Sequence, residues 1–145
     1  MLKVSHQFDA GNIEVVACDK HDDIQLKISN DRHSGFFQWF YYRLQGGAGK
    51  ALHMRILNAG EAAYPEGWED YKAVASYDRQ EWFRVPTRYV DGELIIDHIP
   101  EQNSIYYAYF APYSFEQHLD LIAVAQQSVL CNIGDLGCSL DGRDI

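Results

Sequence analysis

Residues 46–50 read Gly-Gly-Ala-Gly-Lys, which looks like the end of a loop that cradles phosphate groups with backbone N–H groups. Such a loop needs an earlier glycine, a Ser or Thr directly after the lysine, and a helix that follows. Leu44 stands where the first glycine belongs, and Ala51 stands where the hydroxyl belongs. An alternating, strand-like segment follows in place of a helix, so the pattern favours a plain hairpin turn.

His98 and Glu101 form a His-x-x-Glu pair, a spacing that can bring an imidazole and a carboxylate onto one zinc ion. A catalytic zinc site also needs a third protein ligand and an open position for water. No neighbouring His or Cys has a suitable spacing, and Pro100 prevents a helix from running through the motif. The sequence therefore favours a strand end followed by a turn, with a small metal-dependent hydrolase as a less favoured reading.

The other polar candidates are isolated along the chain. No histidine has a His-x-His or His-x-x-x-His spacing, and no serine lies in a Gly-x-Ser-x-Gly elbow. We therefore expect single polar or half-buried side chains and no catalytic, cofactor-binding or metal-binding residue in this chain. The residues concerned are His6, His21, His33, His53, His118, Ser76, Ser114 and Ser139.

Trp39, Trp68 and Trp82 could build a flat stacking platform for a sugar. Trp39, however, lies in a run that is apolar on both faces, residues 36–44 (Phe-Phe-Gln-Trp-Phe-Tyr-Tyr-Arg-Leu). A strand of this kind must be covered on both sides. The pattern would place Phe37, Trp39 and Tyr41 on one face. It would place Phe40, Tyr42 and Leu44 on the other. We therefore expect the tryptophans to anchor the core or loops.

Further strands are predicted along the first three quarters of the chain, where apolar and polar residues alternate between turn residues. Asp91-Gly92 predicts a tight turn between two of these strands. The frequency of strands and turns predicts an antiparallel β-sandwich of seven to nine strands. The expected strands are residues 3–8, 13–18, 24–29, 36–44, 52–57, 72–77, 81–90, 93–99 and 105–110.

The pattern changes near Pro112, where we place a domain boundary between residues 1–112 and 113–145. Ser114 with Gln117 forms a capping box, and apolar residues then repeat at helical spacing, which predicts one helix over residues 115–130. The 33 residues after the boundary are too few to make a core of their own. They must pack on the sandwich, on another chain or on a further part of the protein.

Charge and composition exclude several classes of partner. The chain of 145 residues carries a formal net charge of −9, which makes nucleic acid and anionic membranes poor partners. Cys18, Cys131 and Cys138 are far apart and show no Cys-x-x-Cys pattern, which is typical of reduced cytoplasmic thiols. The N-terminus has no apolar signal segment, and no run is long enough to span a bilayer, so we expect a cytoplasmic protein.

An ordered series of segments resembles the N-terminal β-sandwich domain of the cytosolic zinc carboxypeptidases. The series covers residues 1 to about 112, and each piece is weak when taken alone. The tail 136–145 (Leu-Gly-Cys-Ser-Leu-Asp-Gly-Arg-Asp-Ile) is similar to the opening of the α/β catalytic domain of these enzymes. The segments are residues 38–43, 56–58, 64–68 with Tyr71, 75–78, 82–87 and 107–114.

The resemblance implies a parent enzyme that uses zinc to remove C-terminal amino acids from peptides or proteins. In that family the zinc-binding His-x-x-Glu follows the Gly-Arg segment, and no such motif follows Arg143 before Ile145. The resemblance therefore assigns no catalytic residue here. It implies a non-catalytic domain, inactive alone, that supports the missing catalytic domain and shapes access to its site.

Two further expectations remain open at this point. A free-standing sandwich module that binds a glycan or a protein is the alternative function, because a fold does not fix an activity. The apolar stripe of helix 115–130 also predicts self-association if its catalytic partner is missing. Neither the substrate preference nor the oligomeric state can be read from the sequence.

Overall fold

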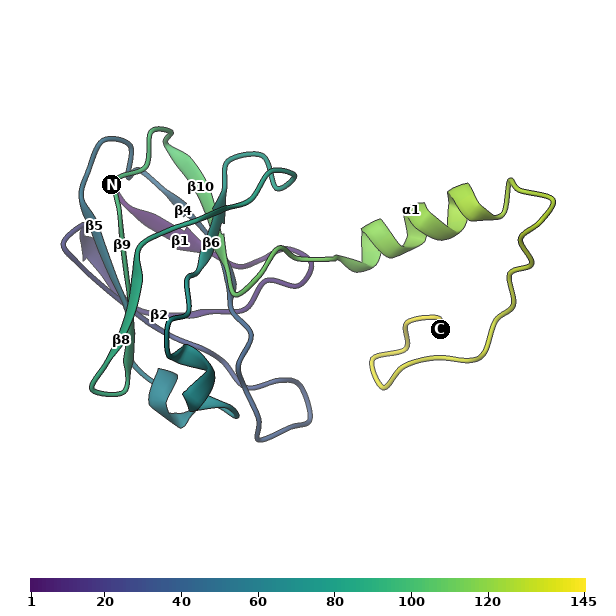
Figure 1. Cartoon of the computed structure of the whole chain (residues 1–145), viewed down its shortest axis with the longest axis horizontal. Coiled ribbons are helices and arrows are strands. Elements are labelled where there is room, and N and C mark those ends of the chain that lie inside the picture. Colours follow the sequence, from purple (N-terminus) through teal and green to yellow (C-terminus); the bar gives the residue numbers. More distant parts are fainter. The chain divides into compact units, whose positions relative to one another are not determined.

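The computed structural model describes residues 1–145 and divides into two compact units, Met1–Pro112 and Tyr113–Ile145 (Figure 1). The first unit carries all ten strands and two short 3₁₀ helices, η1 (Ala59–Glu61) and η2 (Pro65–Trp68). The second carries the helix α1 (Phe115–Ala125). The strands are β1 (Lys3–Ser5), β2 (Glu14–Lys20), β3 (Asp23–Lys27), β4 (Tyr41–Gln45), β5 (Leu52–Ile56), β6 (Val74–Ser76), β7 (Phe83–Arg84), β8 (Thr87–Val90), β9 (Glu93–His98) and β10 (Ser104–Ala108).

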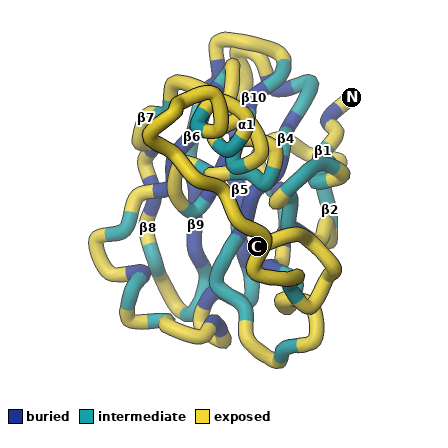
Figure 2. Tube along the Cα trace, turned by 90° about the vertical axis from the view of Figure 1, so that its right-hand side faces the viewer, coloured by how far each residue is buried: buried dark blue, intermediate teal, exposed yellow.

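The strands form two five-stranded sheets that enclose one apolar core. Sheet A has the order β1-β4-β10-β6-β7, and sheet B has the order β2-β3-β5-β9-β8. Alternate residues of each strand face inward, which is the period of two that the sequence shows. In Figure 2 the buried residues lie along the strands, whereas the connecting loops are largely exposed. The largest side chains with no exposed surface are Tyr42, Tyr107, Phe40, Ile13, Ile24, Leu26, Leu44, Met54, Ile56 and Leu94.

The predicted sandwich is confirmed, but it is not wholly antiparallel. Strands β3 and β5 pair in parallel, with Ile24 opposite Met54. The side chain of Asn58 extends this pairing beyond β5. Its Oδ1 accepts a hydrogen bond from the Ile28 backbone N–H at 2.9 Å, and its Nδ2 donates to the Ile28 carbonyl at 2.9 Å. The sheets also hold ten strands in place of the expected seven to nine, because one predicted strand is divided.

That divided strand is residues 81–90. Its first part is β7 in sheet A, and its second part is β8 in sheet B. Pro86 lies between them and has no N–H to donate to a ladder. The backbone N–H of Val85 instead bonds the Ala73 carbonyl at 3.0 Å, so the chain passes from one sheet to the other at this point.

The aromatic run 36–44 is only partly a strand, because β4 begins at Tyr41. The preceding backbone bonds loops: the Phe36 carbonyl accepts from Asp31 N–H, and the Phe37 carbonyl from Ala63 N–H. The predicted faces hold for Phe40, Tyr42 and Leu44, which lie in the main core. Trp39 and Tyr41 lie in a second cluster, as the pattern places them. Phe37 packs on the main core, so its predicted face is wrong.

The predicted hairpin at residues 45–49 is also wrong, because β4 and β5 belong to different sheets. The loop carries the chain across the sandwich. Gly46 N–H donates to the Asn103 carbonyl and Gly49 N–H to the Pro100 carbonyl, so the loop bonds the β9–β10 connection. By contrast, Asp91 and Gly92 form the predicted tight turn between β8 and β9. Their φ angles of 51° and 84° are both positive, as the primed hairpin turns require.

In the second unit, α1 begins as the capping box predicts. The Gln117 N–H donates to Ser114 Oγ at 3.2 Å, and the Ser114 N–H donates to Gln117 Oε1 at 2.7 Å. The helix ends at Ala125, five residues before the predicted end. Gln127 and Ser128 donate to carbonyls three residues back, which tightens and ends the helix, and Val129 is exposed beyond it.

Residues 132–145 of the second unit contain one isolated β-bridge, between Cys138 and Asp144. The guanidinium of Arg143 lies 4.8 Å from the centre of the Phe115 ring. No residue of α1 is buried. None of the protein's helices combines the length and the apolar character that crossing a membrane requires.

Candidate functional site

The Gly-Gly-Ala-Gly-Lys loop does not form a phosphate cradle. Gly46 and Gly49 adopt φ angles of 85° and 70°, and both of their N–H groups donate to the chain's own carbonyls. The Lys50 N–H donates to the Gly47 carbonyl at 3.0 Å. A phosphate site needs several free N–H groups converging on one point, often at a helix N-terminus. Here a strand follows and the amides are used internally.

His98 is a structural residue of the sandwich edge. Its Nδ1 lies 2.9 Å from the hydroxyl of Tyr107 on the neighbouring sheet. Burial lowers the pKa of His98, and the negative charge of Glu101 opposes this shift only in part. A neutral ring with its proton on Nε2 can accept a hydrogen bond at Nδ1 from the Tyr107 hydroxyl, which keeps its proton because burial raises the pKa of Tyr107. Glu101 is exposed, and its backbone N–H donates to the hydroxyl of Tyr77 at 2.9 Å.

The three tryptophans do not lie together as a platform. Trp68 is 1% exposed and donates its indole N–H to the Ala59 carbonyl at 2.8 Å. Trp39 and Trp82 both pack edge-on against Tyr41, with interplanar angles of 73° and 66°. Trp68 thus anchors a loop in the core, and the other two belong to a separate cluster on the outside of sheet A.

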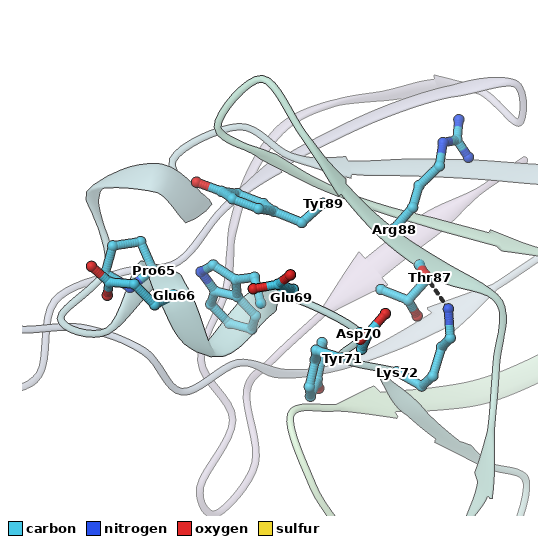
Figure 3. A pocket seen from close by; sticks show the side chains of 10 residues that line it. Pro65, Glu66, Glu69, Asp70, Tyr71, Lys72, Thr87, Arg88 and Tyr89 are labelled. Carbon is cyan, nitrogen blue, oxygen red and sulfur yellow. Dashed lines mark hydrogen bonds between the residues drawn. The ribbon is translucent and has the colours of Figure 1, made fainter.

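A shallow cleft of about 450 Å³ lies between η2, the segment that follows it, and β8 (Figure 3). Lys72 Nζ donates to the Thr87 carbonyl at 2.7 Å across its wall. The Thr87 hydroxyl accepts from the Ala73 N–H and donates to the Val85 carbonyl, so it is held inside the structure. The residues that line the cleft are Pro65, Glu66, Trp68, Glu69, Asp70, Tyr71, Lys72, Thr87, Arg88 and Tyr89.

The chemistry of this cleft does not point to catalysis. Burial raises the pKa of Tyr71 far above its ordinary value, and its hydroxyl donates to the Tyr109 carbonyl. Arg88 is paired with Asp97 outside the cleft. The cleft carries carboxylates, but nowhere in the chain do three His, Cys, Asp or Glu residues converge as a metal site would require. It therefore lacks both an activated nucleophile and a metal centre.

The sequence did not predict the cluster of His53, Asp97 and Arg88 on the outer face of sheet B. His53 Nδ1 lies 2.7 Å from Asp97 Oδ1, and Arg88 pairs with the other carboxylate oxygen. Partial burial opposes ionisation of Asp97, but the hydrogen bonds from His53 and Arg88 outweigh it and hold its pKa below the ordinary value. The cross-strand register of β5 and β9 creates the pair, and spacing along one strand cannot reveal it. No hydroxyl or thiol completes a nucleophilic triad.

A family model described as the cytosolic carboxypeptidase N-terminal domain matches residues 4–110. The chain belongs to this family. The match spans the sandwich from β1 to β10 and leaves out only the first residue of β1.

Among its relatives, this cytosolic carboxypeptidase N-terminal domain is 46% identical over 144 residues to an uncharacterized protein of Zymomonas mobilis. It is 50% identical, with a TM-score of 0.96, to a metallo-carboxypeptidase from Burkholderia cenocepacia. It is 37% identical, with a TM-score of 0.91, to a metallo-carboxypeptidase from Pseudomonas aeruginosa in complex with (2-guanidinoethylmercapto)succinic acid. In each case the match covers 99% of this chain but only 38% of the relative.

The metal of a metallo-carboxypeptidase does not fit the residues of this N-terminal domain. His98 is committed to Tyr107, and His53 to Asp97. No group of three metal-ligating side chains exists in residues 1–145. These residues therefore offer no protein site for a zinc ion.

Proposed function

We propose that residues 1–145 serve a metallocarboxypeptidase that removes C-terminal amino acids from peptides or proteins. In this proposal the sandwich is non-catalytic, supports the catalytic domain and shapes access to its site. The single observation that carries the proposal is the match to the Burkholderia cenocepacia enzyme, with a TM-score of 0.96 over 99% of this chain. The comparison extends past residue 110, where the family model ends.

Residues 113–145 are, in this proposal, the opening of the catalytic domain. A helix is stabilised chiefly by packing its apolar face, and α1 has no buried residue. Leu121 and Val124 are 59% and 67% exposed, and Leu130 beyond the helix is 95% exposed. Such side chains call for a larger domain to cover them. The zinc ligands and the catalytic groups would belong to that domain and not to this chain.

The same exposed side chains lead us to propose that residues 1–145 self-associate when no catalytic domain covers α1. Light scattering at rising protein concentration tests this. A mass that grows with concentration is expected, and replacing Leu121 and Val124 by serine should restore the monomer. We also propose a cytoplasmic location, which the family's cytosolic description and the three free thiols support.

The proposed function is tested with a chimera. Residues 1–145 replace the N-terminal 38% of the Burkholderia cenocepacia metallo-carboxypeptidase. The chimera should release C-terminal amino acids from peptides in a manner that a chelator abolishes and zinc restores. The 145-residue chain alone, supplied with zinc, should release none.

Two results would overturn the proposed function. One is release of C-terminal amino acids by the 145-residue chain alone. The other is a Burkholderia cenocepacia enzyme that keeps full activity and stability after deletion of only the part that matches the sandwich unit, Met1–Pro112. The deletion protein is the matched control for the chimera, because it differs only by the absence of a sandwich.

A further inference from the structure

The outer face of sheet A carries six aromatic side chains, which we call the aromatic patch. Its members come from β4, β10 and the segments that border them in space, although they are far apart in the sequence. Their rings lie against one another and over the small side chains of Val74 and Ala108. The members are Phe8, Trp39, Tyr41, Trp82, Tyr106 and Phe110.

Tyr41 is the centre of the aromatic patch. Its ring centroid lies 4.8 Å from Phe8, 6.2 Å from Trp39 and 5.9 Å from Trp82, each in an edge-on arrangement. These are favourable geometries for ring quadrupoles. Tyr41 is 3% exposed, and burial raises the pKa of its hydroxyl. The surrounding rings therefore act as a cover that is itself only half-buried.

The patch is open at its margin, where Phe110 is 54% exposed and packs on Trp39 at 5.0 Å. Phe110 follows β10, and the sandwich unit ends two residues later at Pro112. The chain thus leaves the sandwich beside the aromatic patch. The polypeptide of the carboxypeptidase relatives is much longer, because this chain spans 38% of it. In the proposed function, the catalytic region is therefore tethered beside this face.

Arg43 adds a polar requirement to the same face. Tyr41 and Arg43 alternate with the inward-facing Tyr42 and Leu44, and Arg43 lies opposite Tyr106 in the register of β10. The Nε of Arg43 is buried and has no hydrogen-bond partner. An unpaired buried donor costs about 1–3 kcal/mol, and more when it is charged. Arg43 as a whole is only half-buried, so part of its side chain is open to an acceptor from outside the sandwich.

A second guanidinium lies on this face, where Arg79 stands 5.7 Å from the Tyr106 ring centre. Two cations beside exposed rings are unusual in a chain of net charge −9. The rings and the two guanidinium groups indicate what a partner surface must offer. It must be apolar at its centre and carry carboxylate or carbonyl oxygens at its edge. Aromatic side chains and arginine are the groups most enriched at protein interfaces.

We propose that the aromatic patch is the surface on which the catalytic region of a metallocarboxypeptidase packs, with an acceptor from that region facing Arg43. This inference rests on the proposed function and specifies which face of the sandwich performs it. The polar outer face of sheet B stays in contact with water. A second copy of the chain, or a membrane, is a different occupant that the experiment below separates from this one.

Hydroxyl-radical footprinting of the 145-residue chain and of the chimera tests the assignment. Labelling of Trp82 and Phe110 should fall roughly fivefold in the chimera, because an interface core excludes water. Labelling of His53, whose side chain is 31% exposed on the outer face of sheet B, should not change. The same labelling can be measured in the full-length Burkholderia cenocepacia enzyme, at the aromatic residues that align with Trp82 and Phe110. That enzyme needs no chimera.

Substitution sharpens the test. Phe110→Asp should lower the thermal stability and the activity of the chimera, since it places a charge in the contact. Phe36→Asp is the matched control, because Phe36 is also exposed, at 71%, and lies outside the aromatic patch. In the 145-residue chain alone both variants should change stability little.

The outcomes separate the two proposals. Protection of His53 with unchanged labelling of Trp82 and Phe110 would overturn this inference and leave the proposed function intact. An active chimera in which neither face is protected would likewise overturn this inference alone, because its activity still supports the proposed function. A third outcome would also overturn the inference: labelling of Trp82 in the 145-residue chain falls as its concentration rises, and is no lower in the chimera. In that case a second copy of the chain would cover the aromatic patch.

Discussion

The outer faces of the two sheets are built in opposite ways. Sheet A exposes clustered rings and leaves one buried guanidinium nitrogen without an acceptor. Sheet B exposes a ladder of charges that satisfy one another across neighbouring strands. Its members are Asp23 on β3, His53 and Arg55 on β5, Glu93 and Asp97 on β9, and Arg88 on β8.

This difference shows that one sandwich can present two kinds of surface. The outer face of sheet B suits contact with water, and the outer face of sheet A suits contact with another protein surface. On sheet B, Arg55 bonds Glu93 at 3.0 Å and Asp23 at 3.2 Å, so the charges are paired without any partner protein. The aliphatic parts of long side chains also cover apolar residues such as Ile95, which lies opposite Arg55 and Arg88 in the register. Sheet A lacks such a covering layer of charges.

Removing the central side chain of each face should show the largest difference in stability between the two faces. Tyr41→Ala should lower the free energy of unfolding of the 145-residue chain by about 3 kcal/mol, because it leaves a cavity under four rings. Arg55→Ala, at the centre of sheet B, should cost about 1 kcal/mol or less, as half-exposed ion pairs usually do. Urea denaturation followed by circular dichroism measures both values.

Tyr41→Phe is the control for this pair of variants. It keeps the ring and should cost far less than Tyr41→Ala. Equal losses for Tyr41→Ala and Arg55→Ala would contradict the comparison, since they would mean that the rings of sheet A contribute no more to folding than the charges of sheet B.

Acid should affect the two faces differently. The pKa of Asp97 is held below its ordinary value, so its pairs stabilise the fold above the unfolded pKa of about 3.9 and are lost as the pH falls through the folded pKa. Asp97→Asn should cost at most about 1 kcal/mol at pH 7. It should also make the decline of stability below about pH 5 shallower than in the wild type.

Unfolding curves at a series of pH values between 7 and about 2.5 measure this effect. A residual decline is expected in the variant, because the pKa of Asp23 and of Asp78 are also lowered, chiefly by hydrogen bonds from Gln25 and from the Gln80 N–H. An Asp97→Asn decline that is as steep as that of the wild type would mean that the His53–Asp97–Arg88 cluster stores no pH-dependent stability.

Much of the sandwich could be predicted because each inner face leaves a period of two in the sequence. The alternation of Leu52, Met54 and Ile56 predicted β5, and the capping box predicted the start of α1. The predicted family is confirmed by the match to residues 4–110. These features depend on neighbouring residues, so the sequence displays them directly.

The errors arose where the partner of a segment is distant. Residues 36–40 are mostly apolar, but the carbonyls of Phe36 and Phe37 bond loops in place of a strand. The loop after β4 crosses between sheets, and its amides bond the carbonyls of residues 100 and 103. The His53–Asp97 pair and the unpartnered Nε of Arg43 depend on register between strands, which single-strand patterns do not contain.

Salt should produce the smallest difference in stability between the two faces, and the one most specific to charge. Raising the ionic strength from 0.1 M to 1 M shortens the screening length from about 10 Å to about 3 Å. Arg55 is paired at the surface of sheet B, so its contribution to stability should shrink by a few tenths of a kcal/mol. The difference in unfolding free energy between wild type and Arg55→Leu, measured at both salt concentrations, reports this change.

The same measurement on Tyr41→Phe provides the contrast, because Tyr41 is held by ring contacts that salt does not screen. Using differences between wild type and variant cancels the general effect of salt on apolar burial, which acts on every version of the chain. A salt-dependent difference for Tyr41→Phe that matches the one for Arg55→Leu would mean that both faces are electrostatic. A dependence confined to Arg55→Leu would leave sheet A as the face whose stability, like its proposed contact, rests on apolar packing.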